Sequence, residues 1–361
     1  MKEMQWSSSM VYSCLSIALF ISALILPKIG KTIQSTNNFN ILLYSGMVMA
    51  LGLIVIGSTN TYLIFLTGWA IIGIAMAMGL YDSLFATIGK VFTGNAKKSI
   101  LWITLISSLA PTISWALVDT IFQHFGWRYT CYLYAILLIV SIFPAHRFVF
   151  SKRENETWEV GQPMGVCHLE VFRSKMYLLL SVNFIIGAVI NTMIVIHLFD
   201  ILTHNQIDTV SIVHIVAFLG PSQAAARILE LLIGKRTAIE MSMISAFTML
   251  FGIVFIFGNT QIAIVGVMLF GIGNGMRSVL RGTLPLTIYG KDQYSLVIGK
   301  LGRMPLFAQA GAPFLSGFIL QQFDMSIFLC LIFILGITNI VVVFLIKNNI
   351  NQNNFSLLNI H

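Results

Sequence analysis

Charged residues are scarce in this chain. Asp, Glu, Lys and Arg make up 9% of its 361 residues, and hydrophobic residues make up 57%. Soluble domains contain about 25% charged residues, so this composition excludes an ordinary soluble domain. The apolar residues form long continuous runs, which differ from the short alternating segments of a membrane β-barrel. The sequence therefore predicts an all-α protein that crosses the membrane several times.

Groups that carry enzyme or metal chemistry are also few. The four cysteines are scattered, without the CxxC spacing of a metal site or the pattern of a disulfide framework. The sequence has no GxxxxGKS or GxxxxGKT nucleotide-binding loop, no HExxH zinc motif and no nucleophile–base arrangement typical of hydrolases. We therefore expect no enzymatic activity, no cofactor and no bound metal.

Eleven apolar runs are long enough to cross a bilayer, which needs about 20 residues. They cover residues 10–28, 40–58, 61–90, 99–118, 128–146, 176–199, 209–233, 239–258, 261–289, 296–321 and 325–346. Lysine and arginine concentrate in alternate loops, and the loops between these are nearly free of both. This distribution explains the net charge of +8 without nucleic acid. It predicts a cytoplasmic C-terminus and, with an odd number of spans, an N-terminus outside.

One loop, at 147–175, is longer and more charged than the others and contains Pro163, which favours a linker. Two bundles of similar size on either side of it indicate the internal repeat common in carriers. We expect four regions: an N-terminal bundle of five spans at 1–146, a cytoplasmic linker at 147–175, a C-terminal bundle of six spans at 176–347 and a cytoplasmic tail at 348–361.

The most unusual stretch, residues 261–290, combines two arginines with many glycines. Arg277 and Arg281 lie one helical turn apart and so share a face. Because an arginine at the centre of a spanning helix costs about 2.5–3.5 kcal/mol, both must face protein, water or a solute rather than lipid. The glycines allow neighbouring helices to approach closely. They are Gly266, Gly271, Gly273, Gly275 and Gly282.

Each of these arginines needs an acceptor. The candidates are Asp82, Glu230, backbone carbonyl groups and an anionic solute. Arg277 is the better candidate for contact with a solute. Arg227 and Glu230 lie three residues apart near the cytoplasmic end of the seventh run, and this spacing predicts an ion pair that acts as a gate or a scaffold.

Other polar residues within the spans are candidates for a functional role. Asp82 lies well inside the third run, where a buried carboxylate suits a proton carrier or the partner of a cationic solute; a structural ion pair is the alternative. His197, Asn191 and Asn274 are candidates to line a polar cavity. For His197 and Asn191, a hydrogen bond within the bundle is the simpler explanation.

Three local motifs resemble the major facilitator superfamily. Residues 125–128 are similar to the turn that opens the family's sixth helix, residues 220–230 to the eighth helix of a bacterial branch, and residues 273–285 to the tenth helix. The resemblance covers nearly the whole chain and implies a bundle of two pseudo-repeated halves. The eleven runs then correspond to the family's helices 2–12, the first helix is missing, and Gln34 stands where the family has an acid.

The resemblance implies a secondary active transporter that moves a small solute by alternating access. We expect proton-coupled efflux by a monomer in a bacterial inner membrane, with the solute and the lipid bilayer as its only partners. Arg281 falls in a family motif, which favours a scaffold role for it. The alternative is a shortened, degenerate membrane protein without transport activity, because the missing helix would remove part of the cavity wall.

Overall fold

The computed structural model describes residues 4, 6, 8–35, 40–91, 96–107, 110–151, 169–233 and 236–358. All regular elements in these ranges are helical. Nine helical segments in the described ranges are long and apolar enough to cross a membrane, and the predicted runs 99–118 and 296–321 are not among them. The predicted all-α, multi-pass architecture is confirmed.

The chain folds into two compact units, each assembled from separate segments. Unit 1 consists of Met1–Gly94, Pro111–Cys167 and Tyr289–Ala310, and unit 2 of Asn95–Ala110, His168–Ile288 and Gly311–His361. The division into bundles at 1–146 and 176–347 stays a prediction, and residues 152–168 of the predicted linker lie outside the described residues.

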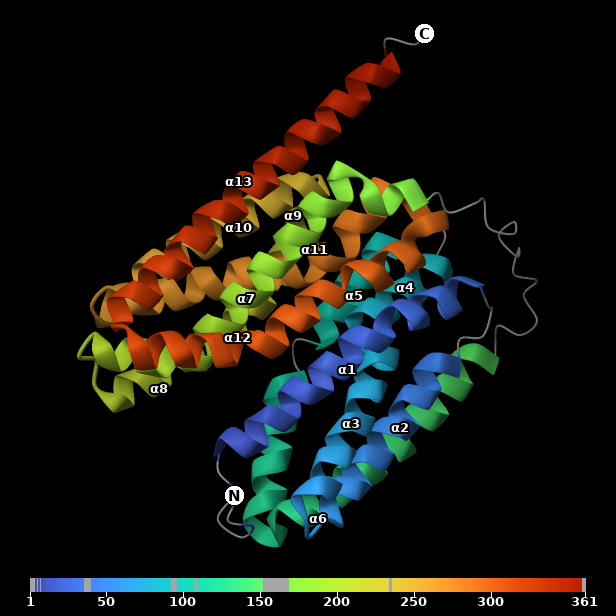
Figure 1. Ribbon diagram of the computed structural model, residues 1–361, viewed down its shortest axis with the longest axis vertical. Helices are drawn as coiled ribbons and strands as arrows, with labels where there is room; N and C mark the ends of the chain where they lie inside the picture. The colour runs from blue at the N-terminus through green and yellow to red at the C-terminus, as the bar shows by residue number, and fades with distance from the viewer. Residues whose placement is uncertain are drawn as a thin grey trace. The chain divides into compact units, whose positions relative to one another are not determined.

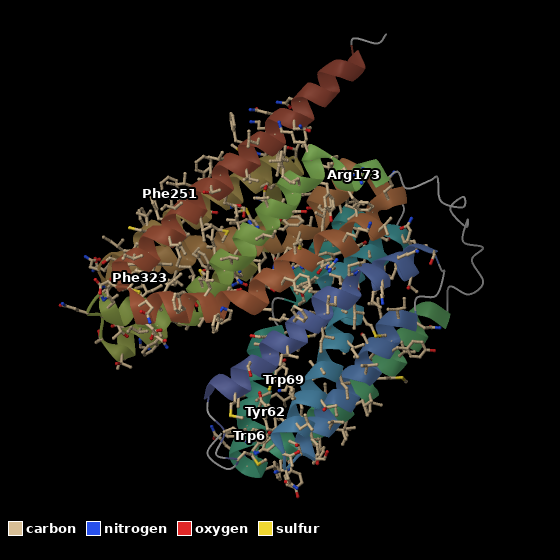
Figure 2. The ribbon with its side chains drawn as sticks, viewed as in Figure 1. Trp6, Tyr62, Trp69, Arg173, Phe251 and Phe323 are labelled. Atoms are coloured by element: carbon tan, nitrogen blue, oxygen red, sulfur yellow. The ribbon has the colours of Figure 1, made fainter. Side chains whose placement is uncertain are left out.

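Unit 1 is built around α3, against which α1 and α2 both pack (Figure 1). An aromatic cluster lies in this unit, where Figure 2 shows Trp6 beside Tyr62. The ring of Trp6 lies 5.7 Å from that of Tyr62 and 5.0 Å from that of Phe65. The helices of this unit are α1 (Ser8–Ser35), α2 (Asn40–Gly57), α3 (Tyr62–Gly79), α4 (Tyr81–Val91), most of α6 (Ala110–Ser151), the end of α11 (Thr260–Leu301) and the start of α12 (Arg303–Gln322).

Unit 2 is built around α7, which packs along α13 (Figure 1). A hydrogen bond of 3.0 Å from Asn183 Nδ2 to Asn339 Oδ1 joins these two helices. Besides the first part of α11 and the end of α12, the unit contains α5 (Ala96–Ser107), η1 (Leu169–Arg173), α7 (Lys175–His204), α8 (Thr209–Ala217), α9 (Leu219–Ile233), α10 (Ala238–Ile256) and α13 (Met325–Leu358).

The glycines of α11 act as predicted from the sequence. A Cβ at Gly275 would lie 2.5 Å from the carbonyl oxygen of Gln223 on α9, and one at Gly273 would lie 2.8 Å from the backbone nitrogen of Met249 on α10. Ser245 Oγ of α10 also donates to the Gly273 carbonyl over 2.7 Å. The absence of a side chain at Gly273 and at Gly275 therefore lets α10 and α9 approach the α11 backbone.

Several predicted boundaries need correction. The third run, expected as one helix over 61–90, breaks at Leu80, whose extended conformation (φ −76°, ψ 177°) separates α3 from α4. The expected loop at 119–127 is helical up to a sharp turn at Gly126 (φ 79°), and Gly290 (φ 66°) makes a similar turn within α11. Positive φ angles favour glycine, which explains how helices join through one residue at these points.

Candidate functional site

Asp82 occupies the first turn of α4, directly after the break at Leu80. Its side chain is 4% exposed. Ser83 Oγ donates to the Ala77 carbonyl over 2.5 Å and so supports the backbone across the break. A carboxylate in the first turn of a helix is favoured by the partial positive charge of that end. The break thus provides a local reason for an acid within an apolar span.

The end of α11 runs antiparallel along α4, and Gly302, the residue that follows it, contacts the Asp82 side chain. Ser295 Oγ donates to the Ala86 carbonyl over 2.8 Å. At one end of this contact, the ring of Tyr294 covers Gly89. At the other end, a Cβ on Gly302 would lie 2.6 Å from Asp82 Oδ2. The Asp82 carboxylate therefore faces the backbone at the α11–α12 junction.

Helix α1 covers the same part of α11 from another side. A Cβ on Gly30 would lie 3.0 Å from the Cα of Gly299. Lys90, at the end of α4, donates to the carbonyl groups of Ile33 (2.9 Å) and Gln34 (3.2 Å). These carbonyls belong to the last turn of α1, which has no intrahelical donors for them. Gln34 thus contributes its backbone to the contact between α1 and α4.

Arg277 reaches from α11 to α7 in unit 2. Its guanidinium lies over Gly187, where a Cβ would collide with the guanidinium group, and Nη2 donates to the carbonyl of Asn183. Of the acceptors considered from the sequence, the structure thus shows a backbone carbonyl. Sequence reasoning missed Gly187, because nothing in a single helical glycine indicates what faces it.

Further polar groups lie close to Arg277 along the two helices. Asn274 and Arg281 lie one turn before and after it on α11, so the three share a face, and all three are partly exposed. On α7, Asn191 lies one turn beyond Gly187. Its Oδ1 is buried and accepts no hydrogen bond from the described residues.

Arg227 and Glu230 are both buried on α9, at 4% and 6% exposure. Arg227 Nη2 donates to Ser278 Oγ on α11 over 2.9 Å. Glu230 lies within the electrostatic influence of Arg227 and of Lys97 on α5. The gate or scaffold role expected for Arg227 and Glu230 stays a prediction, and the bond to Ser278 shows that Arg227 also ties α9 to α11.

His197 joins α7 to α12. Its Nδ1 lies 3.1 Å from Asp200 Oδ2 and its Nε2 lies 2.9 Å from Ser316 Oγ, while Phe328 of α13 packs on the ring at a centroid distance of 5.4 Å. Every polar atom of the ring thus has a partner. Among the described residues, no three His, Cys, Asp or Glu side chains group in a way that could hold a metal ion.

Broken spanning helices, glycine-mediated packing and ionisable groups inside two helical units are typical of polytopic membrane transporters. The sequence model of the Major Facilitator Superfamily matches residues 1–304. The chain belongs to this superfamily, whose members are secondary transporters that bind small-molecule substrates in the membrane and work by alternating access. It is therefore a transporter and not an enzyme.

Solved structures share this fold at low sequence identity. The human organic anion transporter MFSD10 (TETRAN) superimposes with a TM-score of 0.67 at 13% identity, over 92% of this chain and 83% of the other. The proton:xylose symporter XylE, solved with 6-bromo-6-deoxy-D-glucose, gives a TM-score of 0.65 at 11% identity, over 96% of this chain and 88% of the other. No curated protein sequence matches the chain.

Proposed function

We propose that this transporter exports a small solute in exchange for protons across a bacterial inner membrane, with its C-terminus in the cytoplasm. The distribution of lysine and arginine between alternate loops supports the orientation. Efflux is favoured over sugar uptake because the spans carry few fixed polar groups that would suit a sugar.

The burial and position of Asp82 are the observation that supports proton coupling. Asp82 is 4% exposed, and ionisable residues buried in spanning segments often belong to proton relays. It lies in the first turn of α4, directly after the interruption at Leu80, and it faces the junction of α11 and α12. A movement at either break would change the surroundings of the carboxylate and with them its affinity for a proton. XylE is a proton symporter of the same fold, so the fold accommodates such coupling.

Recordings from proteoliposomes on a solid-supported membrane test this proposal. Solute-driven currents and proton movements would be measured with a panel of neutral, cationic and anionic solutes, with and without a pH gradient. We expect Asp82→Asn to lower proton-driven transport at least about tenfold, since loss of a positioned proton-transfer group typically costs 10²–10⁴-fold, while solute exchange without a gradient persists. Unchanged proton-driven transport in this variant would remove Asp82 from the mechanism.

Asp208→Asn is the matched control. Asp208 caps α8 by accepting from the Ser211 backbone N–H over 2.9 Å, and asparagine is an equally good N-cap residue. The variant therefore loses one carboxylate in the other unit without losing the cap, and we expect its transport to equal that of the original protein.

The alternative, a membrane protein without transport activity, predicts no solute-driven current from any solute, with or without Asp82. The missing first helix stays a prediction. The intact mass of the protein isolated from its native membrane would test it directly, since one more span with its flank adds about 25–35 residues.

A further inference from the structure

We infer that Arg277, held over Gly187, is the binding group for an organic anion, so that the transported solute carries an oxyanion such as a carboxylate. This inference rests on the proposed transport function and names the class of solute. It draws on the hydrogen bonding of Arg277, the charge around it and an unsatisfied amide nearby.

The first observation is that the protein uses little of the Arg277 hydrogen-bonding capacity. A guanidinium has five N–H donors, and among the described residues only the Asn183 carbonyl accepts from it. That carbonyl is also part of the α7 helix, so it does not need this donor. The contact fixes the position of the guanidinium and leaves most of its donors available to a ligand.

The second observation is the charge around it. No carboxylate among the described residues forms an ion pair with Arg277. Arg281 lies one turn away on the same face and adds a second positive charge. Two positive charges one turn apart within a spanning helix repel each other, and an anion bound at Arg277 would reduce this repulsion. A guanidinium pairs with an oxyanion through two parallel hydrogen bonds, which suits a carboxylate.

The third observation is Asn191, one turn beyond Gly187 on α7. Its buried Oδ1 accepts no hydrogen bond from the described residues. A buried amide oxygen without a donor destabilises the protein, because its hydrogen bond to water is lost and not replaced. A hydroxyl or amino group next to the carboxylate of a ligand could supply this donor, and Asn274 presents a further amide on the α11 face of Arg277. These groups favour a carboxylate solute that also carries a hydrogen-bond donor.

Gly187 determines where the cation lies. Any side chain at this position would occupy the space that the guanidinium fills and would push it away from α7. Gly187→Ala is therefore a positional test that keeps the charge. The same exchange at Gly317 on α12 is its matched control, because a Cβ there meets nothing within 4 Å.

The experiment measures ligand binding to the purified full chain in lipid nanodiscs. Binding would be followed by thermal stabilisation and by calorimetry. The probes are benzoate with its neutral isostere benzamide, a set of short 2-hydroxycarboxylates with their amides, and a matching phosphate ester. We expect the carboxylates to bind at least tenfold more tightly than their amides. We expect this preference to fall about tenfold to a hundredfold in Arg277→Gln and in Gly187→Ala, as loss of a charge-assisted hydrogen bond predicts.

Arg173→Gln and Gly317→Ala should keep the preference. Arg173 lies exposed at the end of η1 in the same unit (Figure 2), so its removal changes the charge by the same amount without touching the site. Equal binding of carboxylates and amides, no binding of any oxyanion, or a preference that survives in both Arg277→Gln and Gly187→Ala would overturn the inference. Tighter binding of the phosphate ester than of every carboxylate would also overturn the choice of a carboxylate.

Failure of the inference and failure of the proposed function are distinguishable. If the preference for anions is missing while neutral solutes still drive proton movement, the inference is wrong and the proposed function stands. If oxyanions bind through Arg277 and no solute drives proton movement, the proposed coupling is wrong and the site stands.

Discussion

Each unit contains a glycine recess on a long helix, and the two recesses hold different occupants. In unit 1, Gly30 of α1 faces Gly299 of α11, and a Cβ on Gly299 would lie 2.9 Å from the Gly30 Cα. In unit 2, Gly187 of α7 faces the guanidinium of Arg277. A backbone moves away from a new methyl group only if its whole helix moves, whereas a side chain can rotate. The first recess therefore holds helices together, and the second positions a functional group.

Two cations of unit 1 differ from Arg277 of unit 2 in the same way. Arg128 in unit 1 donates from Nη1 to the carbonyls of Gly57 (3.1 Å) and Thr59 (2.7 Å) and from Nη2 to Asn60 Oδ1 (2.9 Å). Lys90 donates to two carbonyls at the end of α1. Arg277 in unit 2 has one acceptor among the described residues. A cation whose donors are occupied by backbone serves the fold, and one whose donors are available can serve a ligand.

The largest effect should come from filling the recess of unit 1. Gly299→Leu would place a side chain where the α1 backbone lies and force the two helices apart. Overpacking of this kind costs about 1–3 kcal/mol and sometimes more, and we expect the upper end because the obstacle is backbone. Unfolding of the purified protein in SDS titrations measures it. Gly317→Leu, which faces open space, is the control, and equal stability of the two variants would contradict the role of the recess.

Removal of Arg128 should have the next largest effect. Arg128→Ala loses three hydrogen bonds that tie α6 to the turn between α2 and α3, and it leaves carbonyl groups without their donor. Hydrogen bonds from charged donors are worth about 1.5–3 kcal/mol, and we expect a total loss of about 2 kcal/mol because the site is partly exposed. Arg128→Lys should recover little, since a lysine cannot present the planar fork. Full recovery by lysine would show that charge alone stabilises this turn.

A smaller effect is expected at the amide pair that joins α7 to α13 in unit 2. Asn339→Leu leaves the buried Asn183 amide without its partner and should cost about 1 kcal/mol, in the range of hydrogen bonds between membrane helices. Replacing both asparagines with leucine should cost less than the sum of the single changes, because no polar group is then left unpaired. A double-mutant cycle measures the difference, and strictly additive losses would mean that the two amides do not interact.

The sequence predicted well those features that depend on local composition. Apolar runs indicated the helices, and the crowded glycines of 261–290 indicated close packing, which Gly273 and Gly275 confirm. The break at Leu80 was not predicted, because neither hydropathy nor a proline marks it. At Gly126 and Gly290 the sequence predicts longer loops, because polar residues interrupt the apolar runs there. The structure instead has helix up to each glycine, since polar residues are compatible with a helix near a membrane surface.

The site depends on contacts between distant parts of the chain, and these could not be read from one sequence. Asp82 faces Gly302, and Arg277 faces Gly187; each pair joins residues 90 or more positions apart. The polar residues themselves stand out against apolar neighbours, which is why Asp82 and Arg277 were candidates. Their glycine partners do not, because a lone glycine in a helix has the same pattern whether it faces lipid, backbone or a guanidinium.

The smallest effect on stability should come from the residue most important for the proposed ligand. Arg277→Gln loses one hydrogen bond to a carbonyl that α7 already uses, and it also removes a charge within a spanning helix and its repulsion from Arg281. These contributions oppose each other, so we expect the free energy of unfolding of the ligand-free purified protein to change by less than about 1 kcal/mol. SDS titration of this variant beside Arg128→Ala measures the contrast. A loss as large as that of Arg128→Ala would mean that Arg277 is a structural cation, and the distinction between the two units would then fail.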